Sequence, residues 1–254
     1  MKVVATHSFR GGSGKTFVAL NVAAVSALSG VKTIVMDCDF NSPSFQSNLA
    51  APLNSKLYAN DFLLGNCQEE DIVTQTSIPN LHAIFSNPKP VLGKGLLDSK
   101  ENIHWKALQR FTELRKSLEE QGYQRFILDT TPTLSFSSIS ALAVADSIVL
   151  VHRPVLHSIE LAIYILSTIY ASLEKSLKQR SFFLIYNQVP IGTDEEINNL
   201  LNTLTSEFKK HLDLKLLGSI PLDTTMDLWD SLLIPDKWTN FKILGQMTTK
   251  LFSD

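Results

Sequence analysis

Residues 9–16, FRGGSGKT, combine glycines with a lysine and a hydroxyl residue at a spacing that suits phosphate binding. Glycines let the backbone curl so that successive N–H groups point inward toward an anion. Lys15 would reach the β- and γ-phosphates of a nucleotide, and the Thr16 hydroxyl would bind Mg²⁺. The ordinary pattern has a glycine where Phe9 stands, so the restrictive part of the match is residues 11–16. These residues predict a phosphate-binding loop between a strand and a helix.

Carboxylates follow two further apolar runs of the chain. Asp37 and Asp39 come directly after residues 33–36, and Asp129 follows residues 126–128. A carboxylate at such a point can hold Mg²⁺ directly or through water, and a second one can orient an attacking water in phosphoryl transfer. The six histidines show no metal-ligand spacing, so the residues indicate no metal other than nucleotide-bound Mg²⁺.

The elements that position these residues alternate along the chain. Strands are predicted at residues 3–8, 33–36, 81–85, 125–128, 147–151, 182–186 and 214–220, and most of these runs are continuously apolar, as strands buried on both faces should be. Helices are predicted at residues 15–29, 105–121, 135–145, 158–178, 194–211 and 238–252. The order predicts an α/β fold with a mostly parallel, doubly wound sheet, flanked by helices on both faces. We expect residues 1–254 to form one domain around this phosphate-binding loop.

Composition indicates the compartment and gives no overall sign of a nucleic-acid or membrane partner. The chain has 44% hydrophobic and 19% charged residues and a formal net charge of −2, so no overall charge points to nucleic acid or to a membrane surface. Cys38 and Cys67 form no CxxC pair. Residues 1–8 lack the apolar core of a signal peptide, and the longest apolar runs are too short to span a bilayer. We expect a globular, cytoplasmic protein.

Residues 10–16 resemble the deviant Walker A loop of the MinD/ParA superfamily of P-loop ATPases, whose pattern is KGGxGK followed by Ser or Thr. Arg10 stands at the position of the family's signature lysine, which reaches across an ATP-sandwiched dimer to the partner's nucleotide. Arginine is also cationic, but it presents a planar fork instead of a point charge. The resemblance therefore implies a role for Arg10 across a dimer interface.

The resemblance extends over most of the chain. The pair Asp37 and Asp39 is similar to the family's switch I, in which the second acid orients the attacking water. Residues 129–132 resemble switch II, usually D-x-P-P or D-x-P-A, with Thr131 where proline is usual. Asn187 ends a strand where the family uses an asparagine to read the adenine edge, and residues 218–223 resemble a G-x-I-P-x-D segment beside the base.

These matches assign roles to particular residues. Lys15, Asp39 and Arg10 are expected to be catalytic, and Thr16, Asp37 and Asp129 to hold Mg²⁺. ATP or ADP is expected to contact Gly11, Gly12, Ser13, Gly14, Lys15, Thr16, Phe17, Asn187, Pro221 and Asp223. The resemblance implies an ATP-hydrolysing switch that dimerises around Mg·ATP and positions or partitions a cargo.

Two alternatives stay open, and a third is disfavoured. One is an accessory ATPase of metal-centre maturation from the same superfamily, although its iron–sulfur carriers use paired cysteines that this chain lacks. Another is a nucleotide-binding module with impaired hydrolysis, which Arg10 and Thr131 keep open. A bacterial tyrosine kinase is disfavoured because such kinases end in a tyrosine cluster, and no tyrosine follows Tyr186.

The expected partners are a second copy of the chain and a protein partner or cargo adaptor. Direct DNA binding is possible but not favoured, because acidic residues intersperse the basic ones near the carboxyl end. Residues 238–252 are expected to dock on the domain's own core, and no membrane tail is evident. The basic residues in question are Lys175, Lys178, Arg180, Lys209, Lys210 and Lys215.

Overall fold

The computed structural model describes residues 1–49, 57–88, 101–132, 135–155, 159–165, 180–190, 192–223 and 239–253. Their strands form one eight-stranded sheet with the order β3-β4-β2-β5-β1-β6-β7-β8. Neighbouring strands are parallel except β3 and β4, which are antiparallel. The strands are β1 (Lys2–His7), β2 (Thr33–Asp37), β3 (Val73–Gln75), β4 (Leu81–Ile84), β5 (Arg125–Asp129), β6 (Ser147–His152), β7 (Ser181–Val189) and β8 (Leu214–Pro221).

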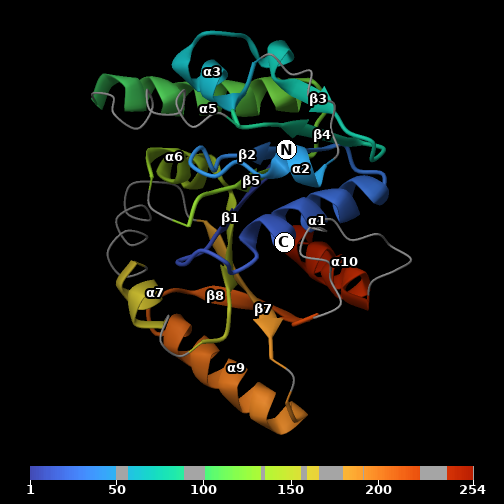
Figure 1. Cartoon of the computed structure of the whole chain (residues 1–254), viewed down its shortest axis with the longest axis vertical. Coiled ribbons are helices and arrows are strands. Elements are labelled where there is room, and N and C mark those ends of the chain that lie inside the picture. The colour runs from blue at the N-terminus through green and yellow to red at the C-terminus, as the bar shows by residue number, and fades with distance from the viewer. Residues whose placement is uncertain are drawn as a thin grey trace.

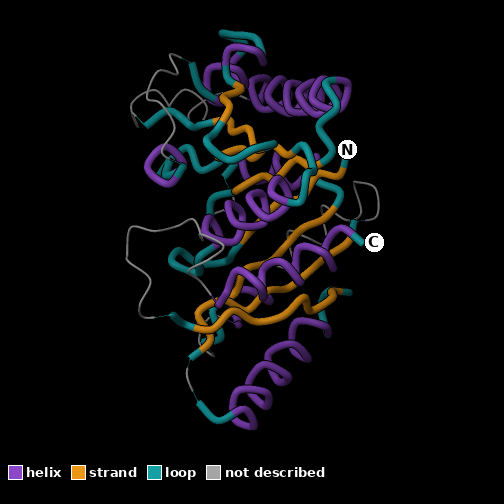
Figure 2. Tube along the Cα trace, turned by 90° about the vertical axis from the view of Figure 1, so that its right-hand side faces the viewer, coloured by secondary structure: helices purple, strands orange, loops and turns teal. Residues whose placement is uncertain are grey.

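Helices cover both faces of this sheet, so the predicted α/β fold is confirmed (Figures 1 and 2). One core lies under α1 and α10, which pack side by side, and the other lies under α3, α5, α6, α7 and α9. The helices are α1 (Lys15–Leu28), α2 (Phe45–Asn48), α3 (Ala59–Leu64), α5 (Glu101–Glu120), α6 (Phe136–Val144), α7 (Ile159–Ile165), α9 (Asp194–Lys209) and α10 (Thr239–Phe252), with a 3-10 turn at Glu69–Asp71.

The continuous apolar runs are explained by the two cores. Side chains alternate across a strand, so Phe182 points into one core and Phe183 into the other. Both are buried, and β7 therefore needs apolar residues at consecutive positions. In α10, Leu244 and Leu251 are buried against α1 and the sheet, as predicted for a closing helix. Among the described residues, none of the helices combines the length and the apolar character needed to cross a membrane.

The structure corrects the sequence reading between β2 and α5. The antiparallel strand β3 and the short helix α2 were not predicted. Val73–Gln75 is short, partly exposed and carries no apolar run, which explains why β3 was missed. An edge strand of this kind pairs through its backbone, so its side chains leave little periodic signal. Helix α5 also begins at Glu101, four residues before its predicted start. Residues 166–178 of one predicted helix lie outside the described residues, as does residue 238.

Candidate functional site

The predicted site residues meet at the carboxyl edge of the sheet. The phosphate loop joins β1 to α1, and β1 lies between β5 and β6 near the centre of the sheet. In the pairing of β2 with β5, Asp37 stands directly opposite Asp129. Asp37 and Asp129, more than 90 positions apart in sequence, therefore lie at the same edge of the sheet as the phosphate loop. Ligand sites of parallel sheets lie at this carboxyl edge.

The conformation of the phosphate loop depends on two glycines. Gly12 has φ 78° and Gly14 has φ 80°, values that side-chain-bearing residues adopt at a cost. A Cβ on Gly14 would lie 2.0 Å from Asn187 Nδ2, whereas one on Gly11 or Gly12 would meet no atom of the described residues within 4 Å. The loop thus packs tightly on one side and leaves open space on the other, which is the shape of an anion cradle.

Lys15 and Asp129 form a buried ion pair at the base of this loop. Their side chains are only 6% and 1% exposed, and Lys15 Nζ donates a hydrogen bond to Asp129 Oδ1. Thr16 Oγ1 donates to Asp129 Oδ2 at 2.6 Å, and Thr6 Oγ1 donates to Asp129 Oδ1 at 3.2 Å. Asp129 therefore gathers the two phosphate-loop residues that were predicted to meet the phosphates and Mg²⁺.

Asp37 is buried and organises the loop that follows β2. Its Oδ1 accepts a hydrogen bond from the Asp39 N–H at 2.9 Å, and its Oδ2 accepts one from the Ser44 N–H at 3.2 Å. Burial, and secondarily the neighbouring charge of Asp129, raise the pKa of Asp37 to about 8. Two buried carboxylates whose negative charges repel each other form a donor set that favours a divalent cation.

The raised pKa of Asp37 predicts that nucleotide-free protein loses stability as the pH rises. The folded chain keeps a proton on Asp37 that the unfolded chain has already released, so the free energy of unfolding falls with pH. Between pH 6.5 and 8.5 we expect a loss of up to about 2 kcal/mol. Thermal melts across this range measure it.

Asp37→Asn is the variant that isolates this slope, because asparagine has the same shape and does not titrate. Burial lowers the pKa of His7 to about 3 and that of His152 to about 4, so their effect is to raise stability as the pH rises through the ordinary histidine range, and they cannot cause a loss between pH 6.5 and 8.5. An Asp37→Asn protein with the same slope as wild type between pH 6.5 and 8.5 would contradict the assignment.

Asp39 lies beside the phosphate loop and shapes its own turn. Its Oδ1 accepts hydrogen bonds from the N–H groups of Asn41 at 3.2 Å and Ser42 at 3.0 Å. Asp39 lines a cavity of about 500 Å³, which we call the phosphate cavity. Its lining consists of Ser8, Arg10, Gly11, Gly12, Ser13, Gly14, Lys15, Thr16, Asp39, Asn41, Ser42, Thr131 and Pro132. All three residues predicted to be catalytic, Lys15, Asp39 and Arg10, thus face one space.

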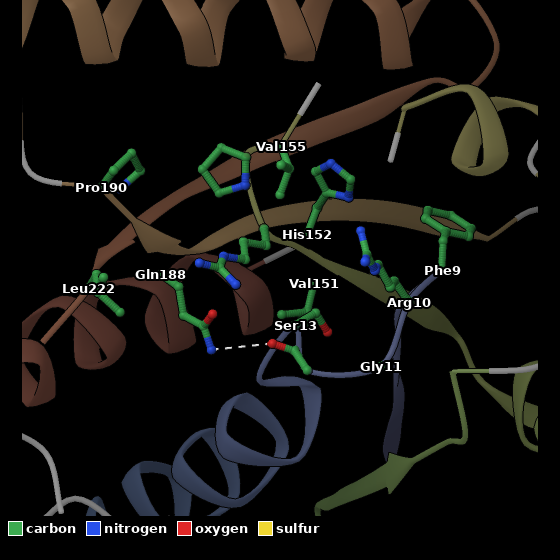
Figure 3. Close-up of a pocket in the computed structure, with 13 residues that line it drawn as sticks. Phe9, Arg10, Gly11, Ser13, Val151, His152, Val155, Gln188, Pro190 and Leu222 are labelled. Atoms are coloured by element: carbon green, nitrogen blue, oxygen red, sulfur yellow. Dashed lines mark hydrogen bonds between the residues drawn. The ribbon is translucent and has the colours of Figure 1, made fainter. Parts of the chain in front are cut away.

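A second cavity, of about 470 Å³, shares Arg10 and residues 11–13 of its lining with the phosphate cavity; we call it the lateral cavity (Figure 3). Arg10 and Arg153, both exposed, line it, and the described residues of its lining include no carboxylate. Sequence reasoning left Arg153 unassigned, because an arginine after a strand is ordinary. Apolar side chains, among them Phe9, Val151 and Leu222, form much of the remaining wall. This combination suits a ligand with an anionic group and a flat apolar part.

Two consecutive side-chain amides near the end of β7 donate hydrogen bonds to backbone carbonyls of the phosphate loop. Asn187 Nδ2 donates to the Ser13 carbonyl at 2.8 Å. Gln188 Nε2 donates to the Gly12 carbonyl at 3.3 Å (Figure 3). Gln188 has φ 57° at a bulge in the pairing of β7 with β8. Sequence reasoning missed Gln188, although a polar pair at a strand end was a usable signal.

The remaining predicted nucleotide contacts lie around the same edge. Pro221 ends β8, and Leu222, between Pro221 and Asp223, lines the lateral cavity. The Phe17 side chain packs against the core under α1, so the part of Phe17 available to a phosphate is its backbone. Pro221 and Asp223 therefore flank a residue of the lateral cavity in sequence, and the Phe17 side chain is partly buried against the core.

The residues present fit a nucleotide with its divalent cation. Ser13 Oγ is buried without a hydrogen-bond partner among the described residues, and it lies in the loop that would cradle the phosphates. No group of three or more His, Cys, Asp or Glu in the described ranges is arranged to hold a metal by itself. A cation here would share its ligands between the carboxylates and the phosphate oxygens, as Mg²⁺ commonly does.

Comparison with known proteins finds a family match over the part of the chain that contains the phosphate loop and the three acids. A family model described as an AAA domain, AAA_31, matches residues 1–181. The sporulation initiation inhibitor protein Soj of Bacillus subtilis is 28% identical over 153 residues, which are 59% of this chain and 57% of Soj. A putative replication protein A of Rhizobium rhizogenes is 26% identical over 169 residues, 61% of this chain and 40% of that protein. The chain thus spans about half the length of the curated relatives it matches.

Solved structures share the fold over almost the whole chain. The septum site-determining protein MinD of Pyrococcus horikoshii, complexed with Mg-ADP, superposes with a TM-score of 0.73 and 17% identity, covering 99% of this chain and 96% of that one. A Cyanothece McdA–ATP complex superposes with a TM-score of 0.81 and 16% identity, covering 98% and 95%. At these identities the likeness is one of fold.

Proposed function

The chain belongs to the AAA_31 family and is a P-loop ATPase of the MinD/ParA type, and on this premise we propose that it binds and hydrolyses Mg·ATP as a molecular switch. ATP-driven dimerisation would then position or partition a cargo. In this proposal residues 1–254 act as one ATPase domain. The observation that carries it is the convergence of Lys15, Asp39 and Asp129 on the phosphate loop.

The site residues divide the chemistry among themselves. Backbone N–H groups of the phosphate loop and Lys15 hold the β- and γ-phosphates, and Lys15 moves from Asp129 toward them. Thr16 and Asp129, with Asp37 nearby, would hold Mg²⁺, which would supply positive charge to neutralise the phosphates. Asp39 orients the attacking water and accepts its proton late in the reaction. Its exposure is intermediate, which leaves room for that water beside the loop.

The lateral cavity is the proposed place of the adenosine. Asn187 can still accept a hydrogen bond through Oδ1 while its Nδ2 donates to Ser13, so adenine reading and loop support are compatible. Pro221 and Asp223 would lie beside the base. We propose ATP over other nucleotides on the strength of this amide, and competition binding with GTP tests it.

Steady-state phosphate release from Mg·ATP tests the proposed function. We expect turnover that disappears in the absence of Mg²⁺. Tight Mg·ATP binding without turnover would instead favour the nucleotide-binding module with impaired hydrolysis. The absence of both Mg·ATP binding and turnover would contradict the proposal altogether.

Arg10 is expected to matter more for dimerisation than for binding ATP. It is exposed and lines both cavities, so its guanidinium can reach a second copy of the chain without leaving the nucleotide edge. Arg10→Ala should therefore weaken the dimer formed with a non-hydrolysable ATP analogue by about tenfold or more, since a lost charge-assisted hydrogen bond costs about 1.5–3 kcal/mol. Light scattering measures the dimer.

Arg10→Lys, which restores the family's residue, is the matched control and should retain the dimer. ATP affinity of the monomer should be nearly the same in all three proteins. An Arg10→Ala dimer as tight as wild type would leave Arg10 as an ordinary loop residue.

We propose a protein partner or cargo adaptor, not DNA or lipid, as the main target. Of the basic residues near the carboxyl end, Arg180 donates to the Ala143 and Ala145 carbonyls, and Lys210 pairs with Glu207. Residues 175 and 178 lie outside the described residues. Strong ATP-dependent DNA retention or liposome pelleting at physiological salt would overturn this part of the proposal.

A further inference from the structure

A cluster of four hydroxyl side chains lies between the two acidic loops of the site. Thr131 Oγ1 lies 2.8 Å from Ser138 Oγ and 3.2 Å from Ser135 Oγ, and Ser135 Oγ lies 2.9 Å from Ser137 Oγ. Thr131, Ser137 and Ser138 are buried. We call Thr131, Ser135, Ser137 and Ser138 the hydroxyl cluster.

The hydroxyl cluster contacts both loops. Ser137 Oγ donates to the Cys38 carbonyl at 3.2 Å, and Cys38 stands between Asp37 and Asp39. At the other end of the hydroxyl cluster, the Thr131 N–H donates to Ser138 Oγ at 3.1 Å. Thr131 comes two residues after Asp129. The Cys38 N–H also donates to the Asp129 carbonyl at 2.8 Å. A continuous path of hydrogen bonds therefore runs from one acidic loop to the other.

This path needs a residue with both a backbone N–H and a side-chain hydroxyl at position 131. A proline has neither the N–H that donates to Ser138 nor a hydroxyl that can join the cluster. Thr131 also lines the phosphate cavity together with Asp39 and Lys15. Thr131, which stands where the family usually has proline, thus uses both its N–H and its hydroxyl to contact the neighbouring serines.

We propose that the hydroxyl cluster couples the loop of Asp39 to the loop of Asp129, and that Thr131 and Ser137 are positioning residues for ATP hydrolysis. This inference rests on the proposed function. A misplaced catalytic group slows the chemical step while the phosphate loop still binds nucleotide. Loss of either hydroxyl should therefore lower kcat more than it raises KM.

The test compares Ser137→Ala and Thr131→Val with Ser140→Ala. Ser140 is buried in the same helix, α6, and its Oγ has no hydrogen-bond partner in the described part of the chain, so Ser140→Ala is a matched control. We expect Ser137→Ala and Thr131→Val to lower kcat roughly ten- to a hundredfold, with Mg·ATP affinity within about twofold of wild type. Thr131→Ser keeps the hydroxyl and should restore most of kcat.

Hydrogen–deuterium exchange of residues 38–44 in nucleotide-free protein gives a second readout that does not depend on turnover. Exchange there should rise in Ser137→Ala and Thr131→Val and stay unchanged in Ser140→Ala. If wild type binds Mg·ATP without hydrolysing it, hydrolysis fails as the function and the exchange result alone decides whether the loops are coupled. With wild-type turnover present, kcat and exchange like those of Ser140→Ala in both variants would overturn this inference and leave the proposed function standing.

Discussion

Lys15→Ala is expected to lose Mg·ATP binding and also to destabilise the nucleotide-free protein. Truncating one partner of a hydrogen-bonded charge pair costs about 2–5 kcal/mol in binding, or roughly 30- to 4,000-fold in affinity. The second effect follows from the ion pair with Asp129, whose carboxylate is only 1% exposed. Removal of the lysine leaves that charge buried with two hydroxyl donors, at a cost of about 3 kcal/mol. Calorimetry measures the affinity, and denaturant unfolding measures the stability.

The double variant Lys15→Ala/Asp129→Asn separates these two effects. It removes the uncompensated charge, so it should regain most of the stability of wild type without regaining nucleotide affinity. Lys116→Ala is the control for a lysine whose ion pair is exposed, and it should change neither quantity. Unchanged ATP affinity in Lys15→Ala would remove Lys15 from the site, whatever happens to the stability.

Asp39→Ala is expected to bind Mg·ATP, to hydrolyse it roughly 100-fold more slowly than wild type and to accumulate as an ATP-bound dimer. The reason is that Asp39 faces the phosphate cavity, while binding rests on the loop and Lys15. Single-turnover phosphate release measures the chemical step, and light scattering measures the dimer.

Asp39→Asn distinguishes the chemistry from the shape of the loop. An asparagine oxygen can still accept the Asn41 and Ser42 N–H groups, so the turn persists while the negative charge is lost. We therefore expect slow hydrolysis in both variants but wild-type exchange of residues 38–44 only in Asp39→Asn. Turnover at the wild-type rate in Asp39→Asn would assign the water to another group, with Asp37 the next candidate.

The sequence by itself determined the phosphate loop, the order of the buried parallel strands and the positions of the acids. Each is a local property: glycines permit left-handed backbone at Gly12 and Gly14, and buried parallel strands require apolar residues at consecutive positions. Once strands alternate with helices, the carboxyl ends of the strands must share one edge. Asp37, Asp39 and Asp129 could therefore be placed beside Lys15 without a structure.

Only the tertiary structure decided how these residues pair. The ion pair of Lys15 with Asp129, the support of the Ser13 carbonyl by Asn187 and the contact of Ser137 with the Cys38 carbonyl each join residues about 100 or more positions apart. Such contacts depend on strand order, register and side-chain direction, which leave no local pattern in the chain. The same reason hid β3, since an edge strand pairs through its backbone and needs no apolar period.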